Sequence, residues 1–197
     1  MVKSYILAAR PKTLPAAVVP VWVGCVLAWK TTGETSWALA FFTLLGAMCI
    51  QVATNLFNDV IDHEKGADTE MRLGPKRATA GGLLSSRAVY GGACFFLLVA
   101  CLASLPLVQS RGLFVIAIGL PSLYLSYGYT GGPFPLAYHG LGELFVILFF
   151  GLVAVGGAFF VQTGEWTWPA GVLGLQVGLL CAVLISINNL RDLKEDQ

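Results

Sequence analysis

The sequence predicts an all-α fold, a polytopic bundle of membrane-spanning helices formed by a single membrane-embedded domain of residues 1–197. Hydrophobic residues make up 56% of the chain and charged residues 12%, and the mean hydropathy is +0.75. These values lie far from those of soluble globular domains. The apolar residues also gather in long stretches, several of which approach the roughly 20 residues that cross a bilayer. The expected environment is the lipid bilayer, and no nucleic-acid partner is expected.

Six apolar stretches follow one another along the chain and predict six spans, at residues 14–29, 37–57, 89–108, 112–127, 141–161 and 170–187. The first begins among Pro11 and Pro15, and proline is tolerated at the start of a helix. The five cysteines all lie within these stretches and have no metal-ligand spacing, so we interpret them as packing residues.

The basic residues indicate how the spans are oriented. If the N-terminus is cytoplasmic, all Lys and Arg residues fall inside except Lys30 and Arg111. An excess of Lys and Arg in cytoplasmic loops is the usual pattern. We therefore predict a cytoplasmic (inner) membrane protein whose N-terminus, a cap loop at about 58–88 and the segment 188–197 share the cytoplasmic face.

The acidic residues form two clusters that directly follow apolar stretches. "NDVIDHEKG" (58–66) aligns with "NNLRDLKED" (188–196), which matches Asn58 to Asn188 and Asp62 to Asp192. The shared offset predicts a duplicated unit. These segments and their flanks hold most of the chain's carboxylates, namely Asp59, Asp62, Glu64, Asp68, Glu70, Asp192, Glu195 and Asp196.

The spacing of these polar residues predicts a metal site. Residues four apart lie on one face of a helix, so Asn58 and Asp62 would project together, as would Asp192 and Asp196. Carboxylate and amide oxygens suit Mg²⁺, which also binds substrate phosphates. Nearby basic side chains are suited to neutralise a phosphate. The simpler interpretation, solvated helix ends, fits two facing acidic clusters less well. We expect a site for an amphiphile with a diphosphate head and an apolar tail.

Several motifs resemble the intramembrane aromatic prenyltransferases of the UbiA-type superfamily. "NDVID" (58–62) and "DLKED" (192–196) match the two acidic motifs of that family. "ARPKTLPAAVVPVWVG" (9–24) and the segment beginning "YTGGPFPLAYHGLGE" (129–143) are most similar to the 1,4-dihydroxy-2-naphthoate polyprenyltransferases of menaquinone biosynthesis. The resemblance covers nearly the whole chain.

The resemblance implies a helical bundle around a central cavity and a transfer of the prenyl group of a polyprenyl diphosphate to 1,4-dihydroxy-2-naphthoate, with decarboxylation. It implies two Mg²⁺ ions, with metal ligands among Asn58, Asp59, Asp62, Asp68, Asp192 and Asp196. Of these, the catalytic set would be Asn58, Asp62, Asp192 and Asp196. Substrate binding would fall to Arg10, Lys12, Arg72, Lys76, Arg77 and Asn188. Many relatives carry a third acid four residues after the second, where this chain has Gly66, so Asp68 would take a different helical phase.

Alternatives remain open for several of these assignments. The acceptor could instead be 4-hydroxybenzoate or haem, and a small membrane transporter with ion-coupling acids is a further reading. The four basic residues Arg10, Lys12, Lys76 and Arg77 could equally act as positive-inside anchors. Tyr124, Tyr127, Tyr129 and Phe134 suit either an acceptor pocket or an interfacial aromatic belt.

The duplicated unit also leads to an expectation about length. The first acidic motif is followed by a loop and about three spans, so an equivalent set is expected after Gln197, and family members usually have about nine spans. We expect residues 1–197 alone to be inactive or unstable, because the acid-lined cavity would open toward lipid.

Overall fold

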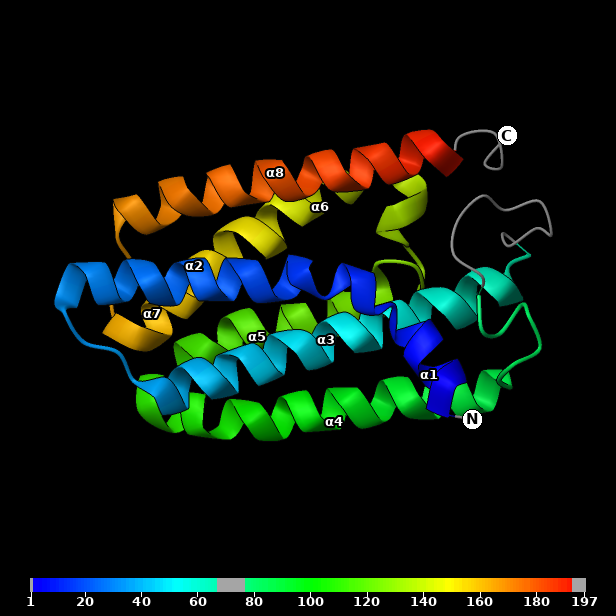
Figure 1. Ribbon diagram of the computed structural model, residues 1–197, viewed down its shortest axis with the longest axis horizontal. Helices are drawn as coiled ribbons and strands as arrows, with labels where there is room; N and C mark the ends of the chain where they lie inside the picture. Colours follow the sequence, from blue (N-terminus) through cyan, green and yellow to red (C-terminus); the bar gives the residue numbers. More distant parts are fainter. Residues whose placement is uncertain (1, 67–76, 193–197) are drawn as a thin grey trace.

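The computed structural model describes residues 2–66 and 77–192, which are predominantly helical and contain no strand. The long helices run along one axis and form an elongated bundle (Figure 1). In chain order the helical elements are α1 (Val2–Ala9), η1 (Pro11–Thr13), α2 (Pro15–Thr32), α3 (Trp37–Glu64), α4 (Ser86–Arg111), α5 (Leu113–Gly128), η2 (Leu136–His139), α6 (Gly142–Val146), η3 (Ile147–Gly156), α7 (Gly157–Thr163) and α8 (Trp168–Asp192).

The predicted spans correspond to helices of this bundle. Five helical stretches are long and apolar enough to cross a membrane: α2, α3, α4, the continuous rod α6–η3–α7, and α8. The remaining predicted span, residues 112–127, corresponds to α5, an apolar helix of 16 residues. The protein is therefore a multi-pass membrane protein with an all-α fold, as predicted. The short helix α1 was not predicted.

The two helices that flank the predicted cap loop, at about 58–88, extend into that range. Helix α3 continues to Glu64, since a helix satisfies its backbone hydrogen bonds internally whether its side chains are apolar or charged. Helix α4 begins at Ser86, and the hydroxyl of Ser85 accepts a hydrogen bond from the Ala88 amide at 3.3 Å, which caps the helix. The motif "NDVID" therefore lies on a helix.

Glycine residues allow α8 to approach the π-helical stretch η3 closely. A Cβ at Gly178 would lie 2.6 Å from the carbonyl oxygen of Ile147, and one at Gly151 would lie 2.4 Å from that of Gly174. Only a residue without a side chain fits at such distances. Small residues commonly permit this kind of contact between membrane helices. The α6–η3–α7 rod is thus held tightly against α8.

A cavity of about 550 Å³ lies inside the bundle. Its walls come from α2, α3, α4, α5 and the α6–η3–α7 rod, and they are mostly apolar. Ile50, Leu123 and Phe149 are typical of its lining, while Tyr129 and Leu136 line it in the connection between α5 and α6. The central cavity implied by the family resemblance is therefore present.

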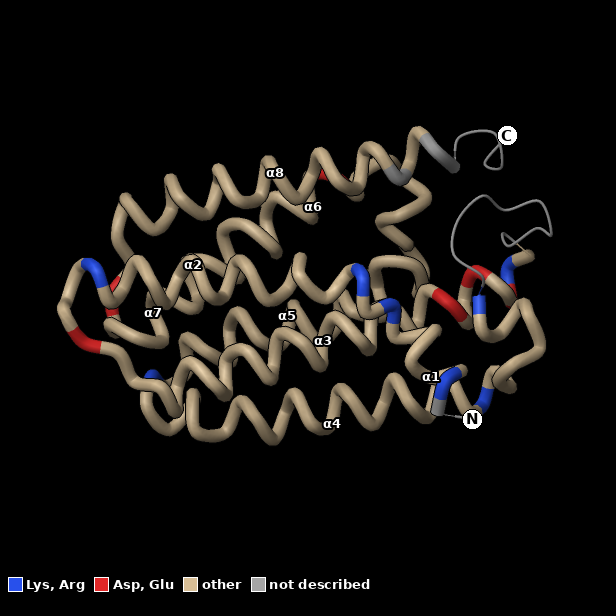
Figure 2. The backbone as a smooth tube through the Cα atoms, in the orientation of Figure 1, with Lys and Arg blue, Asp and Glu red and all other residues tan. Residues whose placement is uncertain are grey.

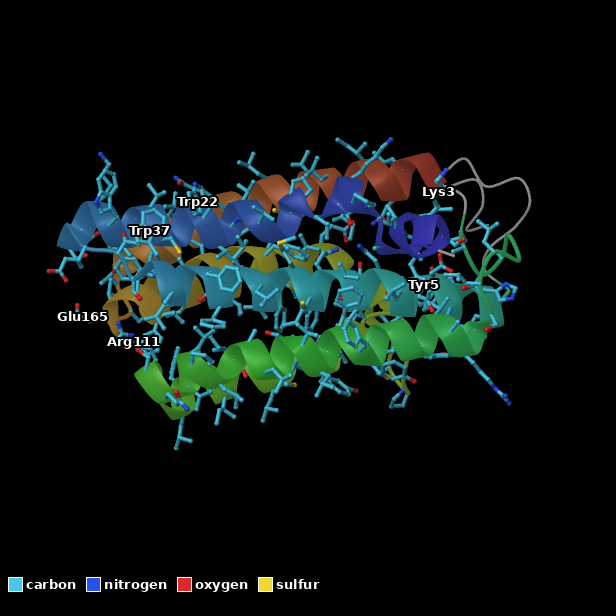
Figure 3. The ribbon with its side chains drawn as sticks, turned by 60° about the horizontal axis from the view of Figure 1, so that its bottom comes forward. Lys3, Tyr5, Trp22, Trp37, Arg111 and Glu165 are labelled. Atoms are coloured by element: carbon cyan, nitrogen blue, oxygen red, sulfur yellow. The ribbon has the colours of Figure 1, made fainter. Side chains whose placement is uncertain are left out.

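Charged residues lie mainly toward the two ends of the bundle (Figure 2). Helices α3 and α8 both finish at the same end, beside the N-terminus, as the duplicated unit requires (Figure 1). We call this end, where α3 stops at Glu64 and α8 at Asp192, the acidic end. The opposite end, which we call the far end, carries Trp37, Arg111 and Glu165 (Figure 3).

Candidate functional site at the acidic end

Asn58 and Asp62 lie in the last two turns of α3 and face the same segment, the connection between α5 and α6. The Asn58 side-chain oxygen accepts a hydrogen bond from the hydroxyl of Thr130. One carboxylate oxygen of Asp62 accepts a hydrogen bond from the hydroxyl of Tyr138 at 2.8 Å. The two residues therefore share a helix face, as their spacing predicts.

Asp62 also forms an ion pair with Arg77, from the short described segment before α4. The two side chains are 17% and 5% exposed, respectively. A guanidinium so shielded from water acts on nearby anions more strongly than one at the surface. The structure thus brings Arg77, a predicted substrate-binding residue, to the predicted acidic motif.

Lys65 connects α3 to the same α5–α6 connection. Its ammonium group donates a hydrogen bond to the carbonyl oxygen of Thr130 at 2.7 Å and lies 4.5 Å from the centre of the Tyr138 ring. The Lys65 ammonium therefore lies near the ring whose hydroxyl donates to Asp62. Thr130 and Tyr138 were not assigned from the sequence, although both belong to the segment 129–143 that carries the family resemblance. The family resemblance pointed to this segment, but no spacing in the sequence connects Thr130 or Tyr138 to Asp62.

Asp59 has hydrogen-bond partners in a different segment from those of Asn58. Its two carboxylate oxygens accept hydrogen bonds from the backbone amides of Ala78 and Thr79, both at 2.9 Å. The residue is only 1% exposed. Both carboxylate oxygens of Asp59, a predicted metal ligand, thus contact the backbone at 78–79.

The N-terminal segment is held against α3 by Asn55, which sequence reasoning missed. The buried Asn55 side chain donates hydrogen bonds to the carbonyl oxygen of Ala9 at 2.8 Å and to the Thr13 hydroxyl at 2.9 Å. Between them lie the predicted substrate-binding residues Arg10 and Lys12. Arg10 adopts a left-handed backbone conformation with φ of 50°, which non-glycine residues rarely adopt outside constrained sites. The turn that carries both cations is therefore fixed to the helix of the first acidic motif.

The second motif begins at the end of α8. Asn188 and Asp192 lie in its last two turns. The side-chain amide of the neighbouring Asn189 donates a hydrogen bond to the carboxylate of Glu143 of α6 at 2.8 Å. Asp68, Arg72, Lys76 and Asp196 lie outside the described residues, so their predicted roles stay predictions.

Tyr129 lies at the cavity wall. Burial raises the pKa of its phenol to about 12, and the negative charges of Glu143 and Asp62 add to this effect. The phenol therefore stays protonated and neutral at physiological pH. Among the aromatic residues for which a pocket role was considered, Tyr129 is the one that lines the cavity in the described structure.

The donor set at the end of α3 fits Mg²⁺. Asp62 offers a carboxylate and Asn58 a carboxamide oxygen, and Mg²⁺ is usually bound by one or two carboxylates together with water and substrate phosphates. Within residues 2–66 and 77–192, no three His, Cys, Asp or Glu residues are grouped as a metal site. The described end of α3 therefore offers two oxygen donors, from Asn58 and Asp62.

Comparison with known proteins identifies the family of the chain. Residues 17–197 match the model of the UbiA prenyltransferase family. The chain is similar to the 1,4-dihydroxy-2-naphthoate octaprenyltransferases of Haemophilus influenzae (34% identity, 95% of this chain and 63% of that protein) and Mycobacterium tuberculosis (36%, 98% and 65%). The corresponding protein of Escherichia coli is 33% identical over 99% of this chain and 65% of its own length. The chain thus spans somewhat less than two thirds of the length of these relatives. It belongs to the UbiA prenyltransferase family.

Proposed function

We propose that the protein transfers a polyprenyl group from a polyprenyl diphosphate to 1,4-dihydroxy-2-naphthoate, in menaquinone biosynthesis. The observation that carries this proposal is a polar cluster of Asp62, Arg77, Lys65 and Tyr138 next to an apolar cavity. The relatives' names supply the acceptor, since three of them are 1,4-dihydroxy-2-naphthoate octaprenyltransferases.

The shape of the site suits an amphiphilic donor. The segment 129–139 contributes Tyr138 to the polar cluster. The same segment contributes Tyr129 and Leu136 to the cavity wall. The cluster and the cavity are therefore adjacent. A diphosphate head would lie among the charged groups, and the prenyl chain would lie against the mostly apolar cavity wall.

The charges at the acidic end suit the departure of diphosphate. When the allylic C–O bond breaks, the diphosphate takes the electron pair, and Arg77 and Lys65 are positioned to stabilise its added charge. Asn58 and Asp62 would hold Mg²⁺ together with Asp192 and Asp196 of the second motif, and two ions are expected. Bound Mg²⁺ would supply Lewis-acid stabilisation of the leaving diphosphate.

The acceptor then replaces its carboxylate with the prenyl group. The ring carbon that bears the carboxylate bonds to the allylic carbon, and the carboxylate leaves as CO₂ while its bonding electrons stay in the ring. The mostly apolar cavity wall protects the allylic cation from capture by water. The neutral phenol of Tyr129 adds no negative charge near the reacting groups.

We also propose that the acidic end faces the cytoplasm across the inner membrane, on the strength of the Lys and Arg distribution. The experiment is labelling with a membrane-impermeant maleimide after His63→Cys at the acidic end or Glu165→Cys at the far end. Both positions are exposed. Position 165 should react in intact cells and position 63 only after lysis. The opposite pattern would reverse the topology.

The activity is tested in membranes of a host without its own menaquinone prenyltransferase, containing the protein at its natural length. A labelled polyprenyl diphosphate is offered with 1,4-dihydroxy-2-naphthoate, 4-hydroxybenzoate or haem. We expect a decarboxylated prenylnaphthalenediol from the first acceptor only, with dependence on Mg²⁺ or Mn²⁺. Transfer to another acceptor would overturn the acceptor assignment, and full turnover in excess EDTA would overturn the metal assignment.

A further inference from the structure

Asp59 is an acidic residue of the first motif whose contacts the proposed chemistry does not use. It lies one residue after Asn58 on α3, yet each of its carboxylate oxygens accepts one backbone amide hydrogen, from Ala78 and Thr79 at 2.9 Å. Its exposed fraction is 1%. A carboxylate buried to this extent is strongly destabilising unless it is hydrogen-bonded. The two charge-assisted hydrogen bonds compensate for that burial.

The backbone that Asp59 holds forms a compact turn at residues 77–84, which we call the cap turn. The amide of Leu83 donates to the carbonyl oxygen of Ala78 at 2.9 Å, and the amide of Gly81 donates to that of Arg77 at 3.1 Å. Gly82 has φ of 66°, a conformation that favours glycine. Fixing the amides of Ala78 and Thr79 therefore fixes the whole turn, including the backbone of Arg77.

Arg77 precedes the two held amides directly, and its guanidinium pairs with Asp62. Both acids lie on α3, three residues apart, so the helix sets the distance between the anchor of the cap turn and the partner of its arginine. Ala78 of the cap turn and Val60 of α3 are fully buried in the same apolar cluster, so apolar packing also holds the cap turn against α3. Asp59 thus holds the backbone that directly follows Arg77.

We propose that Asp59 is a positioning residue, which anchors the cap turn so that Arg77 is held at the diphosphate site, and that it is not a metal ligand. This inference rests on the proposed function for its effect on the donor substrate. It predicts that the loss of Asp59 weakens the use of the polyprenyl diphosphate through Arg77. A metal ligand would instead change the Mg²⁺ requirement.

The kinetic experiment compares Asp59→Asn with Glu64→Gln, which removes the same charge from the end of α3. Glu64 accepts a hydrogen bond from Tyr90 and has no part in the proposed chemistry. Asp59→Asn should raise KM for the polyprenyl diphosphate about tenfold, the scale set by leaving a buried amide without its acceptor. The Mg²⁺ concentration at half-maximal rate should stay at the wild-type value, and Glu64→Gln should change neither quantity. An increased Mg²⁺ requirement with unchanged KM would overturn the proposal.

A double-mutant cycle tests whether Asp59 acts through Arg77. In an Arg77→Gln background, Asp59→Asn should raise the donor KM by less than about twofold further, because coupled residues are non-additive. Independent, multiplying effects of the two substitutions would contradict the proposal. If Asp59→Asn does not fold, Gly82→Ala replaces it, since it strains the cap turn without touching α3 and should raise the donor KM in the same direction. An unchanged KM in a folded Gly82→Ala protein would count against the proposal.

Hydrogen exchange gives a measurement that does not depend on activity. In Asp59→Asn, the peptide covering residues 77–85 should exchange at least about tenfold faster than in the wild type or in Glu64→Gln, because one of the amides of Ala78 and Thr79 loses its acceptor and meets the Asn NH2 group instead. Unchanged exchange would overturn the anchoring role. A protein that transfers no prenyl group but shows faster exchange in this variant would fail the proposed function while retaining the anchor.

Discussion

The two ends of the bundle each use an arginine, and the two arginines have different partners. At the far end, Arg111 donates hydrogen bonds to the backbone carbonyl oxygens of Val161 and Gln162, at 2.7 and 2.6 Å. At the acidic end, Arg77 pairs with the side chain of Asp62. Arg111 satisfies backbone carbonyl groups of the kind that every helix leaves without a partner at its C-terminus. Arg77 instead pairs with a side-chain carboxylate.

The surroundings of Arg111 extend this contrast. The carbonyl groups it contacts belong to the last turn of α7, whose carbonyls have no partner within the helix. The side chain of Gln162 exchanges two hydrogen bonds with the backbone of Ser36, at 2.8 and 3.1 Å, and so connects α7 to the start of α3. Polar groups at the far end therefore stabilise the connections between helices.

At the acidic end, several polar contacts instead join side chains from segments far apart in the chain. Thr130 and Tyr138 reach Asn58 and Asp62 across 72 and 76 residues. Such contacts orient the functional groups of the motif. Under the proposed function, the far end is structural and the acidic end carries the chemistry, so substitutions at each end should affect different quantities.

The largest expected effect is that of Asp62→Asn. It keeps the size of the side chain but removes the charge that pairs with Arg77 and would hold metal, so the transfer rate should fall by a factor of about 10² to 10³. The measurement is the initial rate of prenyl transfer per folded protein. A variant with half the wild-type rate would remove Asp62 from the site, and Glu64→Gln serves as the control for charge.

The next effect distinguishes the two arginines. Arg77→Gln should lower kcat/KM for the polyprenyl diphosphate about 10- to 100-fold, because the leaving diphosphate loses a shielded cation. Arg111→Gln should leave kcat/KM of the folded protein unchanged and lower the free energy of unfolding by about 2 kcal/mol, since buried carbonyls lose their donors. Rates and thermal unfolding in detergent measure both. Equal losses of kcat/KM in Arg77→Gln and Arg111→Gln would contradict the distinction between the two ends.

A smaller effect is expected for Tyr138→Phe. The substitution keeps the ring that lies over Lys65 but removes the hydroxyl that donates to Asp62, which corresponds to about a two- to tenfold loss of kcat/KM. The kinetic assay used for Asp62→Asn measures this. A loss as large as that of Asp62→Asn would instead make Tyr138 a primary part of the site.

The sequence allowed the helical membrane fold and the shared face of Asn58 and Asp62 to be predicted, because both depend on local periodicity. The partners of Asp59 could not be predicted, since the amides of Ala78 and Thr79 are backbone groups with no sequence signature. Thr130 and Tyr138 were missed for a related reason: their contacts depend on how α5 packs beside α3. The predicted span ended at residue 57 because the apolar stretch ends there, whereas the polar residues 58–64 continue α3.

Binding of a donor analogue tests the difference between the two ends most directly. The measurement is the affinity of a non-reactive polyprenyl diphosphate analogue for the wild type, Arg77→Gln and Arg111→Gln, each with Mg²⁺ and with EDTA. We expect Mg²⁺-dependent binding of equal affinity in the wild type and Arg111→Gln, and binding weakened about tenfold or more in Arg77→Gln. Equal affinity in all three proteins, or a loss confined to Arg111→Gln, would contradict the assignment of the acidic end as the diphosphate site.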